Sequence, residues 1–454
     1  MNIFLSTWHP HADGVTSDTA IFQKALDALS QAGGGTLVVE SGKYYLGGLR
    51  IGSDTCLWLS PGAELIVSDN YADFTQAVAL SRAECSDRAF LYARDAENIT
   101  LCGGGTINGN AAGWFSSTAD DMGYRAPAEQ RPRIILLENC QRVRLENIVV
   151  RHAPMWTIHL VSCLQVVIDG VTVDNDLTMA NTDALDIDSC QQVHIANCFF
   201  SAADDAICLK TTDKPATLQR TLRQVTIVNC SLRSKSCAFK IGTETWEDIE
   251  DIVVSNCTIY DSNRGIGLIS RDGGRLRRIV FTGITFQCVT ALACHWGAAD
   301  PIFLSARRRD PLIEPGEITQ VQFRGLSGEC EGAINMHSET PGGINRIQLE
   351  NIQLTQRLYR QGGQGNYDIR PPCNPRSPKG TGRDNAWCLN PETGNVWGVE
   401  PYPGGLPVLF ANGVFGLFIR ELDWQRPEPL PVGWNAQALC LEKCEQARVG
   451  NLSQ

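Results

Sequence analysis

The segment Val161-Ser-Cys-Leu-Gln-Val-Val-Ile-Asp-Gly170 has close counterparts at Glu138–Asn147 and at Asp188–Asn197. Each is a short alternating pattern rich in β-branched residues that ends in Asn or Gly. The strand pattern returns at 224–229, 251–256 and 278–283, and the final Asn or Gly residues are then 23, 27, 32, 27 and 27 residues apart. A period of this length, without a helical 3.6-residue pattern, predicts a β-solenoid.

Stacking of the coils explains two columns of cysteines. One coil cannot bury its apolar face alone, so coils stack and equivalent positions lie above one another. The columns are Cys140, Cys163 and Cys190, and Cys198, Cys230 and Cys257. Metal or redox chemistry is one interpretation, but no CxxC pair and no Cys/His cluster with zinc spacing is present, so we favour small buried apolar side chains. The recurrent Asn residues are expected to form a ladder of side-chain amides at the turns.

The repeat does not begin at the first residue. Asp13–Leu29 is typical of an amphipathic helix capped by Ser17 or Asp18, with Ile21, Ala25 and Leu26 facing inward. We therefore expect one domain over 1–454: an N-terminal cap (1–32), solenoid coils (33–356), a long loop excursion rich in Gly, Pro, Asn and Arg (357–405), and C-terminal coils (406–454).

Composition restricts partners and location. The formal net charge of −11 argues against nucleic acid and anionic membrane surfaces as partners. No apolar run approaches the roughly 18–20 residues of a membrane span. The N-terminus has no export signal, and the 18 cysteines are then expected to be reduced, so we expect a cytoplasmic protein. A chain trimmed of its leader would give the same pattern. The sequence does not indicate an oligomeric state.

Two acidic clusters lie about one repeat apart, Asn181–Asp188 and Ala203–Lys210. Stacking of adjacent coils, roughly 4.8 Å apart, is expected to bring Asp183, Asp204 and Asp205 together. Like charges this close raise at least one pKa, which supplies a proton donor beside ionised bases. Hydrolysis of a glycosidic bond needs this division of roles. The alternatives are a calcium site or a solvated acidic edge without a role.

These residues resemble those of glycoside hydrolase family 28, the polygalacturonase family. The resemblance covers about residues 12–300, and its matching motifs are Asn181-Thr182-Asp183, Asp204-Asp205, Ile241-Gly242-Thr243-Glu244, Pro154–His159, Asp13–Asp18 and Gly103–Gly109. It implies a single-stranded right-handed parallel β-helix and an inverting, metal-free, cofactor-free hydrolase of α-linked pectic sugars. It further implies Asp204 as general acid, Asp183 and Asp205 as the residues that position and activate water, and Asn181 and Glu244 as substrate contacts.

The departures from that family concern the recognition of a carboxylate. Its members carry a Gly-His-Gly motif where this chain has Lys235-Ser236-Cys237, with Ser236 in place of the His. They also carry an Arg-Ile-Lys motif, whose three places here hold Gly267, Leu268 and Ile269. Loss of both cations makes ordinary polygalacturonan a doubtful substrate, since charge-assisted contacts are the strong ones.

Strand alternation suggests substitutes for the missing cations. Lys240 has the parity of Ser236, and Arg271 has the parity of Gly267 and Ile269. We expect these two and Arg264 near the cleft; the alternative is a surface lysine and a turn arginine.

Aromatic residues are the remaining candidate sugar contacts. Trp156 is equally consistent with a packed solenoid residue, and His159 with a hydrogen-bonded edge histidine. Trp296 stands in a predicted loop and is the better candidate for a sugar contact.

The sequence thus favours an intracellular glycosidase acting on short pectic oligosaccharides of the galacturonide or rhamnogalacturonan type. The 357–405 excursion is long enough to block one end of a cleft, which would make the enzyme exo-acting. Two other classes remain open: a calcium-dependent polysaccharide lyase on the same fold, and a non-catalytic carbohydrate-binding solenoid.

Overall fold

The Asn and Gly residues that mark the repeat are the residues at which the backbone turns. Asn147, Gly170, Asn197, Asn229, Asn256 and Gly283 all have φ between 53° and 65°, in the left-handed region. Gly and Asn visit this region at lower cost than other residues, which explains why only these two types stand at the marker. The expected amide ladder is present where the Asn229 side chain donates to the Asn197 side chain at 3.4 Å.

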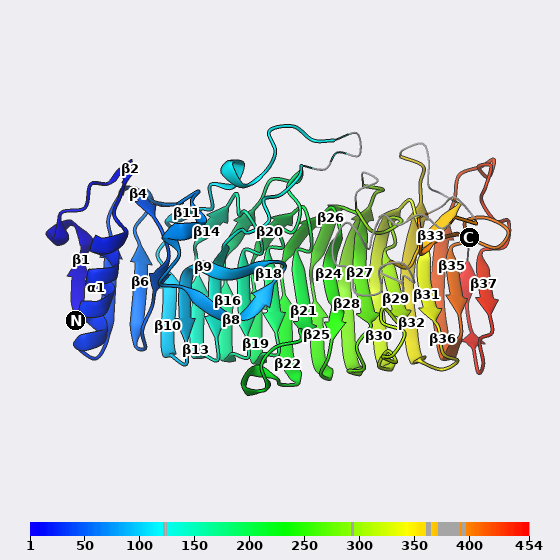
Figure 1. Ribbon diagram of the computed structural model, residues 1–454. Coiled ribbons are helices and arrows are strands. Elements are labelled where there is room, and N and C mark those ends of the chain that lie inside the picture. Colours follow the sequence, from blue (N-terminus) through cyan, green and yellow to red (C-terminus); the bar gives the residue numbers. More distant parts are fainter. Residues whose placement is uncertain are drawn as a thin grey trace. The chain divides into compact units, whose positions relative to one another are not determined.

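The computed structural model describes residues 1–120, 123, 125–291, 295–359, 365–370, 391–392 and 396–453. The chain divides into two compact units, Met1–Ile207 with Asp213–Cys230 (unit 1) and Cys208–Thr212 with Ser231–Gln454 (unit 2). Both are built from coils of a parallel β-helix (Figure 1). Among the described residues, no helix is long and apolar enough to cross a membrane.

In unit 1, each coil contributes strands to up to three columns, and strands within a column pair in parallel. The first column is β1 (Asn2–Phe4), β3 (Gly35–Val39), β6 (Thr55–Leu59), β10 (Glu97–Cys102), β13 (Gln141–Glu146), β16 (Leu164–Asp169), β19 (Gln191–Ala196) and β22 (Leu222–Val228). The second column is β2 (Asp13–Ser17), β4 (Gly42–Leu46), β7 (Ala63–Val67), β11 (Thr106–Asn108), β14 (Val149–Arg151), β17 (Thr172–Asp174) and β20 (Phe199–Ala202). The third column is β5 (Leu49–Arg50), β9 (Ser86–Arg94), β12 (Arg133–Glu138), β15 (Ile158–Val161) and β18 (Leu185–Asp188). A further strand, β8 (Val78–Ala83), pairs antiparallel with β9.

Unit 2 continues the same scheme with longer strands. Its first two columns begin with β23 (Ser231–Ser234), β25 (Ile249–Ser255) and β26 (Thr258–Ser262), then merge into β28 (Leu276–Cys288), β30 (Ile318–Cys330), β32 (Ile344–Gln356) and β36 (Val414–Gln425), which pairs with β38 (Arg448–Val449) and β39 (Leu452–Ser453). Its third column holds β24 (Cys237–Thr245), β27 (Arg264–Ser270), β29 (Ile302–Ala306), β31 (Ile334–Ser338), β35 (Leu409–Asn412) and β37 (Leu439–Glu442). The strand β21 (Ile207–Thr211) also carries third-column residues.

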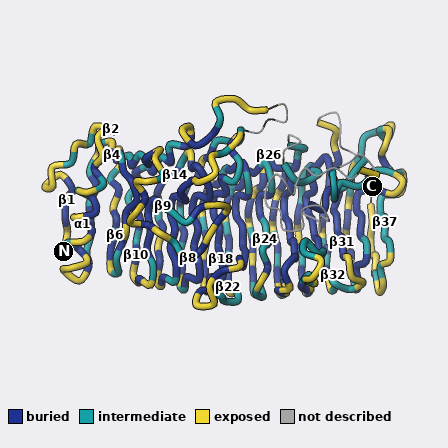
Figure 2. The backbone as a smooth tube through the Cα atoms, viewed as in Figure 1, coloured by how far each residue is buried: buried dark blue, intermediate teal, exposed yellow. Residues whose placement is uncertain are grey.

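Stacked side chains of like size form the core inside the coils. Val143, Val166 and Val193 lie at the same register position of neighbouring strands and are fully buried. In unit 2 the rings of Phe281 and Phe323 stack with centroids 5.0 Å apart. Burial of each such side chain stabilises the fold by roughly 1.5–3 kcal/mol. Figure 2 shows buried residues running through the strands, while exposed residues gather at turns and loops. The six cysteines of the two predicted columns are likewise buried.

The predicted N-terminal helix is present as α1 (Thr19–Gln31), with Phe22, Ala25 and Leu26 buried. It begins after Asp18, but the Asp18 carboxylate makes no cap hydrogen bond to the helix. It accepts instead from the backbone N–H groups of His11 and Ala12, at 2.8 and 3.0 Å. The preceding residues form β1 and β2 and pair with the first coil, which the sequence did not predict.

Part of the predicted excursion over 357–405 forms structure. The strands β33 (Asn366–Asp368) and β34 (Val399–Pro401) pair antiparallel. Residues 360–364, 371–390 and 393–395 of the excursion lie outside the described residues. Strands resume at β35 and β36, as predicted for the C-terminal coils.

Candidate active site

The three predicted catalytic carboxylates come together in unit 1. One carboxylate oxygen from each of Asp183, Asp204 and Asp205 lies within 4.8 Å of those of the other two. Asp183 and Asp205 are buried, with 3% and 1% of their surface exposed, whereas Asp204 is half-buried. Asp204 is thus the member of the trio most open to a leaving group, and the other two are shielded from solvent.

The backbone explains why the trio meets. The N–H of Thr157 donates to the carbonyl of Asp183 at 2.8 Å, and the N–H of Ala184 donates to the carbonyl of Asp205 at 2.9 Å. The first hydrogen bond joins Asp183 to the preceding coil. The second joins Ala184, the residue after Asp183, to the following coil. Side chains on adjacent coils are therefore one strand spacing apart, as the repeat predicted.

The turn before Asp183 is fixed by polar contacts. Thr182 is fully buried, its hydroxyl donates to the Met179 carbonyl at 2.8 Å, and its own carbonyl accepts from the Asn175 amide at 2.9 Å. The Asn181 backbone is left-handed, with φ of 57°. Its side-chain oxygen accepts from Arg131 at 3.0 Å. Asn181 is thus part of the hydrogen-bond network of this turn, and its predicted contact with substrate stays a prediction.

Arg131 is a supporting residue that sequence reasoning missed. It is 3% exposed, and besides Asn181 it donates to the carbonyls of Pro154 and Ala180 at 2.9 and 3.0 Å. These acceptors belong to two different turns, so one guanidinium ties them together beside Asp183. No local pattern marks it, because its partners lie 23 and 49 residues away.

Two predicted sugar contacts, Trp156 and His159, are buried instead. Trp156 is 6% exposed and packs against Ala83 and Met155, and its ring meets the His159 ring edge-on at 5.0 Å. His159 is fully buried. Neither ring offers a face to a sugar, because the segment that carries β8 covers this part of the third column.

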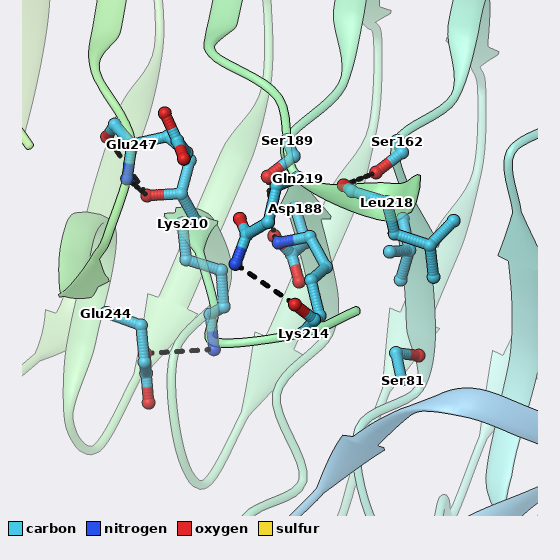
Figure 3. Close-up of polar contacts among 12 residues, drawn as sticks. Ser81, Ser162, Asp188, Ser189, Lys210, Lys214, Leu218, Gln219, Glu244 and Glu247 are labelled. Atoms are coloured by element: carbon cyan, nitrogen blue, oxygen red, sulfur yellow. Dashed lines mark hydrogen bonds and ion pairs between the residues drawn. The ribbon is translucent and has the colours of Figure 1, made fainter. Parts of the chain in front are cut away.

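His159 belongs to a buried chain of charged groups. Arg133 lies 3.0 Å from its Nδ1, and a guanidinium only donates, so Nδ1 is the acceptor and the proton is on Nε2. Nε2 lies 3.5 Å from an Asp188 carboxylate oxygen. The other Asp188 oxygen accepts from Lys214 at 2.6 Å, with both side chains fully buried (Figure 3). Burial acts to raise the pKa of Asp188, but Lys214 and His159 outweigh it and hold that pKa well below its usual range. These buried charged groups, linked one to the next, support β18, which begins two residues after Asp183.

In unit 2, Arg264 and Arg271, which were predicted to lie near the cleft, are both buried. Arg271 is fully buried and donates to the Ser305 carbonyl at 3.1 Å and the Ile369 carbonyl at 3.2 Å. Arg264 is 2% exposed, donates to the Asp368 carbonyl and places its guanidinium 3.9 Å from the centroid of the Phe303 ring. Both cations therefore hold the strap, our name for residues 366–370, onto the third column. Strand parity could not predict that a distant segment covers them.

Trp296 remains half-buried. Its carbonyl accepts from the Asn263 amide at 2.9 Å, and the next residue, Gly297, donates its N–H to Asp368 at 2.6 Å. The loop is thereby tied to the strap. Trp296 keeps its place as a candidate sugar contact.

Glu244 and Lys240 lie in a cluster of charges on β24. Lys210 on β21 lies 3.9 Å from the Glu244 carboxylate (Figure 3). Burial acts to raise the pKa of Glu244, but Lys210, Arg309 and Lys240 outweigh it and bring that pKa down to about 2. Glu244 is therefore ionised at neutral pH. Arg309, which the sequence did not single out, is part of this cluster.

The fold agrees with comparisons to known proteins. The profile of Glycosyl hydrolases family 28 matches residues 72–303, just over half of the chain. The chain belongs to this family.

Individual relatives are distant. A probable polygalacturonase of Vitis vinifera is 25% identical over 297 residues, covering 61% of this chain and 58% of the relative. An exo-poly-alpha-D-galacturonosidase of Dickeya chrysanthemi is 24% identical, covering 62% of this chain and 54% of the relative. The chain thus spans between half and two thirds of the length of these curated relatives.

Solved structures confirm the fold. A family 28 exopolygalacturonase of Yersinia enterocolitica superposes with a TM-score of 0.68 at 16% identity, covering 99% of this chain and 78% of that chain. An exopolygalacturonase of Thermotoga maritima gives a TM-score of 0.66 at 19% identity, covering 78% of this chain and 87% of that chain.

Proposed function

We propose that the protein hydrolyses α-linked pectic oligosaccharides of the galacturonide or rhamnogalacturonan type, removing sugars from a chain end. Asp204 acts as general acid on the leaving oxygen. Asp183 and Asp205 hold and activate the water that attacks the anomeric carbon. The glycosidic C–O bond breaks, the water oxygen forms the new bond to the anomeric carbon, the proton lost by the water passes to the Asp183–Asp205 pair, and the Asp204 proton goes to the leaving group.

The observation that carries the proposal is the trio itself. Three carboxylates from two adjacent coils converge, two of them shielded and one accessible. Two-carboxylate inverting enzymes usually separate acid and base by about 6.5–9.5 Å, and retaining ones by about 5–5.5 Å. The distance between nearest oxygens, within 4.8 Å, does not select inversion by this rule. The third carboxylate supports inversion, because a pair of carboxylates can hold the water.

Exo action is supported by the strap. Arg264 and Arg271 hold its carbonyls, and Arg370 donates to Asp368 within it at 2.7 Å. A segment fixed by two arginines at β27 and β29 covers this part of the third column of unit 2. A sugar chain that followed this column could not continue past the strap, whereas a chain end could stop there.

The test is turnover on defined substrates. Wild type and Asp204→Asn are incubated with a panel of acidic and neutral pectic oligosaccharides, and products are followed by chromatography. Release of a saturated sugar by wild type but not by the variant supports the proposal. Absence of any product from wild type across the panel would leave a carbohydrate-binding solenoid as the better reading.

A calcium-dependent lyase is the second candidate, because the geometry of the trio would also admit a divalent cation. A lyase would yield an unsaturated product that absorbs in the near ultraviolet, and it would lose activity with a chelator. Hydrolysis that persists in excess EDTA and yields only saturated products contradicts it.

We also propose a reducing compartment for the protein, in line with the expected cytoplasmic location. The fifteen described cysteines are all unbridged, and most are buried. Secreted proteins more often pair their thiols. Fractionation of the native host, with activity recovered in the soluble cytosolic fraction, is the measurement that checks this.

A further inference from the structure

The merged first and second columns of unit 2 carry a groove on their outer face. Its floor is formed by β30, β32 and β36, which pair in parallel and lie side by side (Figure 1). The groove has a volume of about 380 Å³, within the range of about 300–1,000 Å³ that is usual for ligand sites. The described residues that line it are Gln320, Gln322, Arg346, Gln348, Gly416 and Phe418. None of them lies on the third column or within residues 72–303, which match the family.

The backbone explains why the groove forms. Gln320, Arg346 and Gly416 have φ of 56°, 52° and 60°, and each stands between residues that pair with the neighbouring strand. A left-handed residue bends an extended strand, because its backbone leaves the β region. Three such bends at the same level of adjacent strands make a hollow that crosses the strands. Gly416 has no side chain, so the hollow stays open on β36.

The polar side chains of the groove are not engaged elsewhere in the protein. Within the described part of the chain, the Arg346 guanidinium forms no ion pair and no hydrogen bond. The same is true, among the described residues, of the side-chain amides of Gln320, Gln322 and Gln348. Each glutamine therefore keeps two N–H donors and a carbonyl acceptor for a ligand, and Arg346 keeps its five donors.

A similar groove on the first column of unit 1 differs in its charges. It has a volume of about 560 Å³ and is lined by Arg142, whose backbone is also left-handed, and by Arg144. Arg142 forms an ion pair with Glu97, and Arg144 forms one with Glu146. The two cations of that groove are therefore neutralised by the protein itself, whereas Arg346 is not.

Phe418 gives the groove of unit 2 an apolar surface. Its side chain is 38% exposed, and it stands in one row with Gln322 and Gln348, at the same register of the three strands. A sugar ring has a face of C–H groups and a rim of hydroxyls. The C–H face packs on an aromatic ring, whose own face is negative, and the hydroxyls pair with amides. The row offers both kinds of contact at the spacing of adjacent strands, about 4.8 Å.

We propose that this groove is a non-catalytic binding site for an acidic saccharide chain. Phe418 packs on a sugar ring, Gln322 and Gln348 pair with hydroxyls, and Arg346 binds a carboxylate. Charge complementarity selects an acidic chain, because Arg346 is an uncompensated cation and no carboxylate is among the described residues that line the groove. The site lies apart from the third column and the strap, so it holds a saccharide without taking part in its cleavage. The inference does not rest on the proposed function.

An acidic peptide is the other chain that carries carboxylates. Peptides that bind to sheets pair their main chain with an exposed strand edge. The strands β30, β32 and β36 each have a paired strand on both sides, so their backbone groups are already used. The groove therefore offers side chains alone, which favours a saccharide over a peptide.

The experiment is isothermal titration of the full chain carrying Asp204→Asn, so that no ligand is hydrolysed during the measurement. Arg346→Gln, Phe418→Ser and Arg142→Gln are compared in this background. Glutamine stands at the same left-handed level in Gln320, so Arg346→Gln removes the charge and keeps the backbone. Arg142→Gln is the matched control, because that arginine is paired within the protein. Thermal melting confirms that each variant is folded.

The ligands are a galacturonic acid oligomer, the same oligomer with its carboxyl groups reduced to alcohols, and an oligomer of glutamic acid. We expect Arg346→Gln to raise the Kd of one binding event for the acidic saccharide roughly tenfold or more, with little change for the reduced one. Phe418→Ser should weaken both saccharides, because the ring contacts sugar carbons whatever their charge. Arg142→Gln should bind as the unsubstituted chain does.

Three results would overturn the inference. The first is binding of the acidic saccharide that Arg346→Gln and Phe418→Ser leave unchanged, which would place every saccharide elsewhere on the chain. The second is no binding at all, which would leave the groove a solvated sheet face. The third is binding of the glutamic acid oligomer as tight as that of the saccharide, which would make the ligand a peptide. Titration needs no turnover, so a failure of the proposed function would not change any of these readings.

Discussion

Replacement of Lys214 by Met tests the linked buried charges that involve Asp188 of β18. Lys214 and Asp188 are both fully buried, with 2.6 Å between the Lys Nζ and a carboxylate oxygen. At an effective dielectric constant of about 20, the gross attraction at this distance is about 6 kcal/mol. Most of it offsets the desolvation of the two groups, so the relevant quantity is the cost of leaving one charge alone, about 3–5 kcal/mol.

The contacts that survive place the expected loss at the lower end of this range. In Lys214→Met, Asp188 keeps the Ser189 hydroxyl at 3.1 Å and the His159 ring at 3.5 Å. We therefore expect the free energy of unfolding to fall by about 3 kcal/mol at pH 7. Reversible urea unfolding followed by tryptophan fluorescence measures it. Lys24→Met on α1 is the control, because Lys24 is exposed in the same unit.

The pH dependence gives a second readout with a definite sign. The pKa of Asp188 is depressed in the folded protein, so its stabilising contribution is present above the ordinary aspartate pKa of 3.8. That contribution is lost as the pH falls towards the depressed folded value. Because Lys214 is the main cation that lowers this pKa, the difference between wild type and Lys214→Met should shrink below about pH 4. A loss no larger than that of Lys24→Met, or a difference independent of pH, would refute the reasoning.

Three further predictions concern the reaction. Asp204→Asn should lower kcat about a thousandfold or more with KM little changed, measured as reducing-end release; a loss below tenfold would exclude Asp204 as the acid. Proton NMR of the first product should show the anomer opposite to that of the substrate bond, and retention would contradict the water-activating role of Asp183 and Asp205. Arg271→Met should free the strap, so that chromatography shows longer products beside the terminal sugar; an unchanged product pattern would show that the strap does not limit the mode of action.

The sequence by itself determined the repeat, the turns and the proximity of the three aspartates Asp183, Asp204 and Asp205. Asn147 and Gly170 mark turns because a left-handed backbone selects these residue types, and this preference is local. Asp183 and Asp204 are one coil apart, and stacking of coils turns that separation along the chain into proximity. Prediction succeeded here because a β-helix makes distance in space a function of distance along the chain.

Only the tertiary structure decided which outward residues are accessible. The sequence offers His159 as a candidate sugar contact and Arg271 as a substitute cation, but it cannot show that the segment around β8 and the strap cover them. Arg309 reaches Asp272 across 37 residues, and its loop has no repeat from which the contact could be read. Contacts within the repeat follow from its period, whereas contacts made by segments outside the repeat depend on how those segments fold back, which no local pattern encodes.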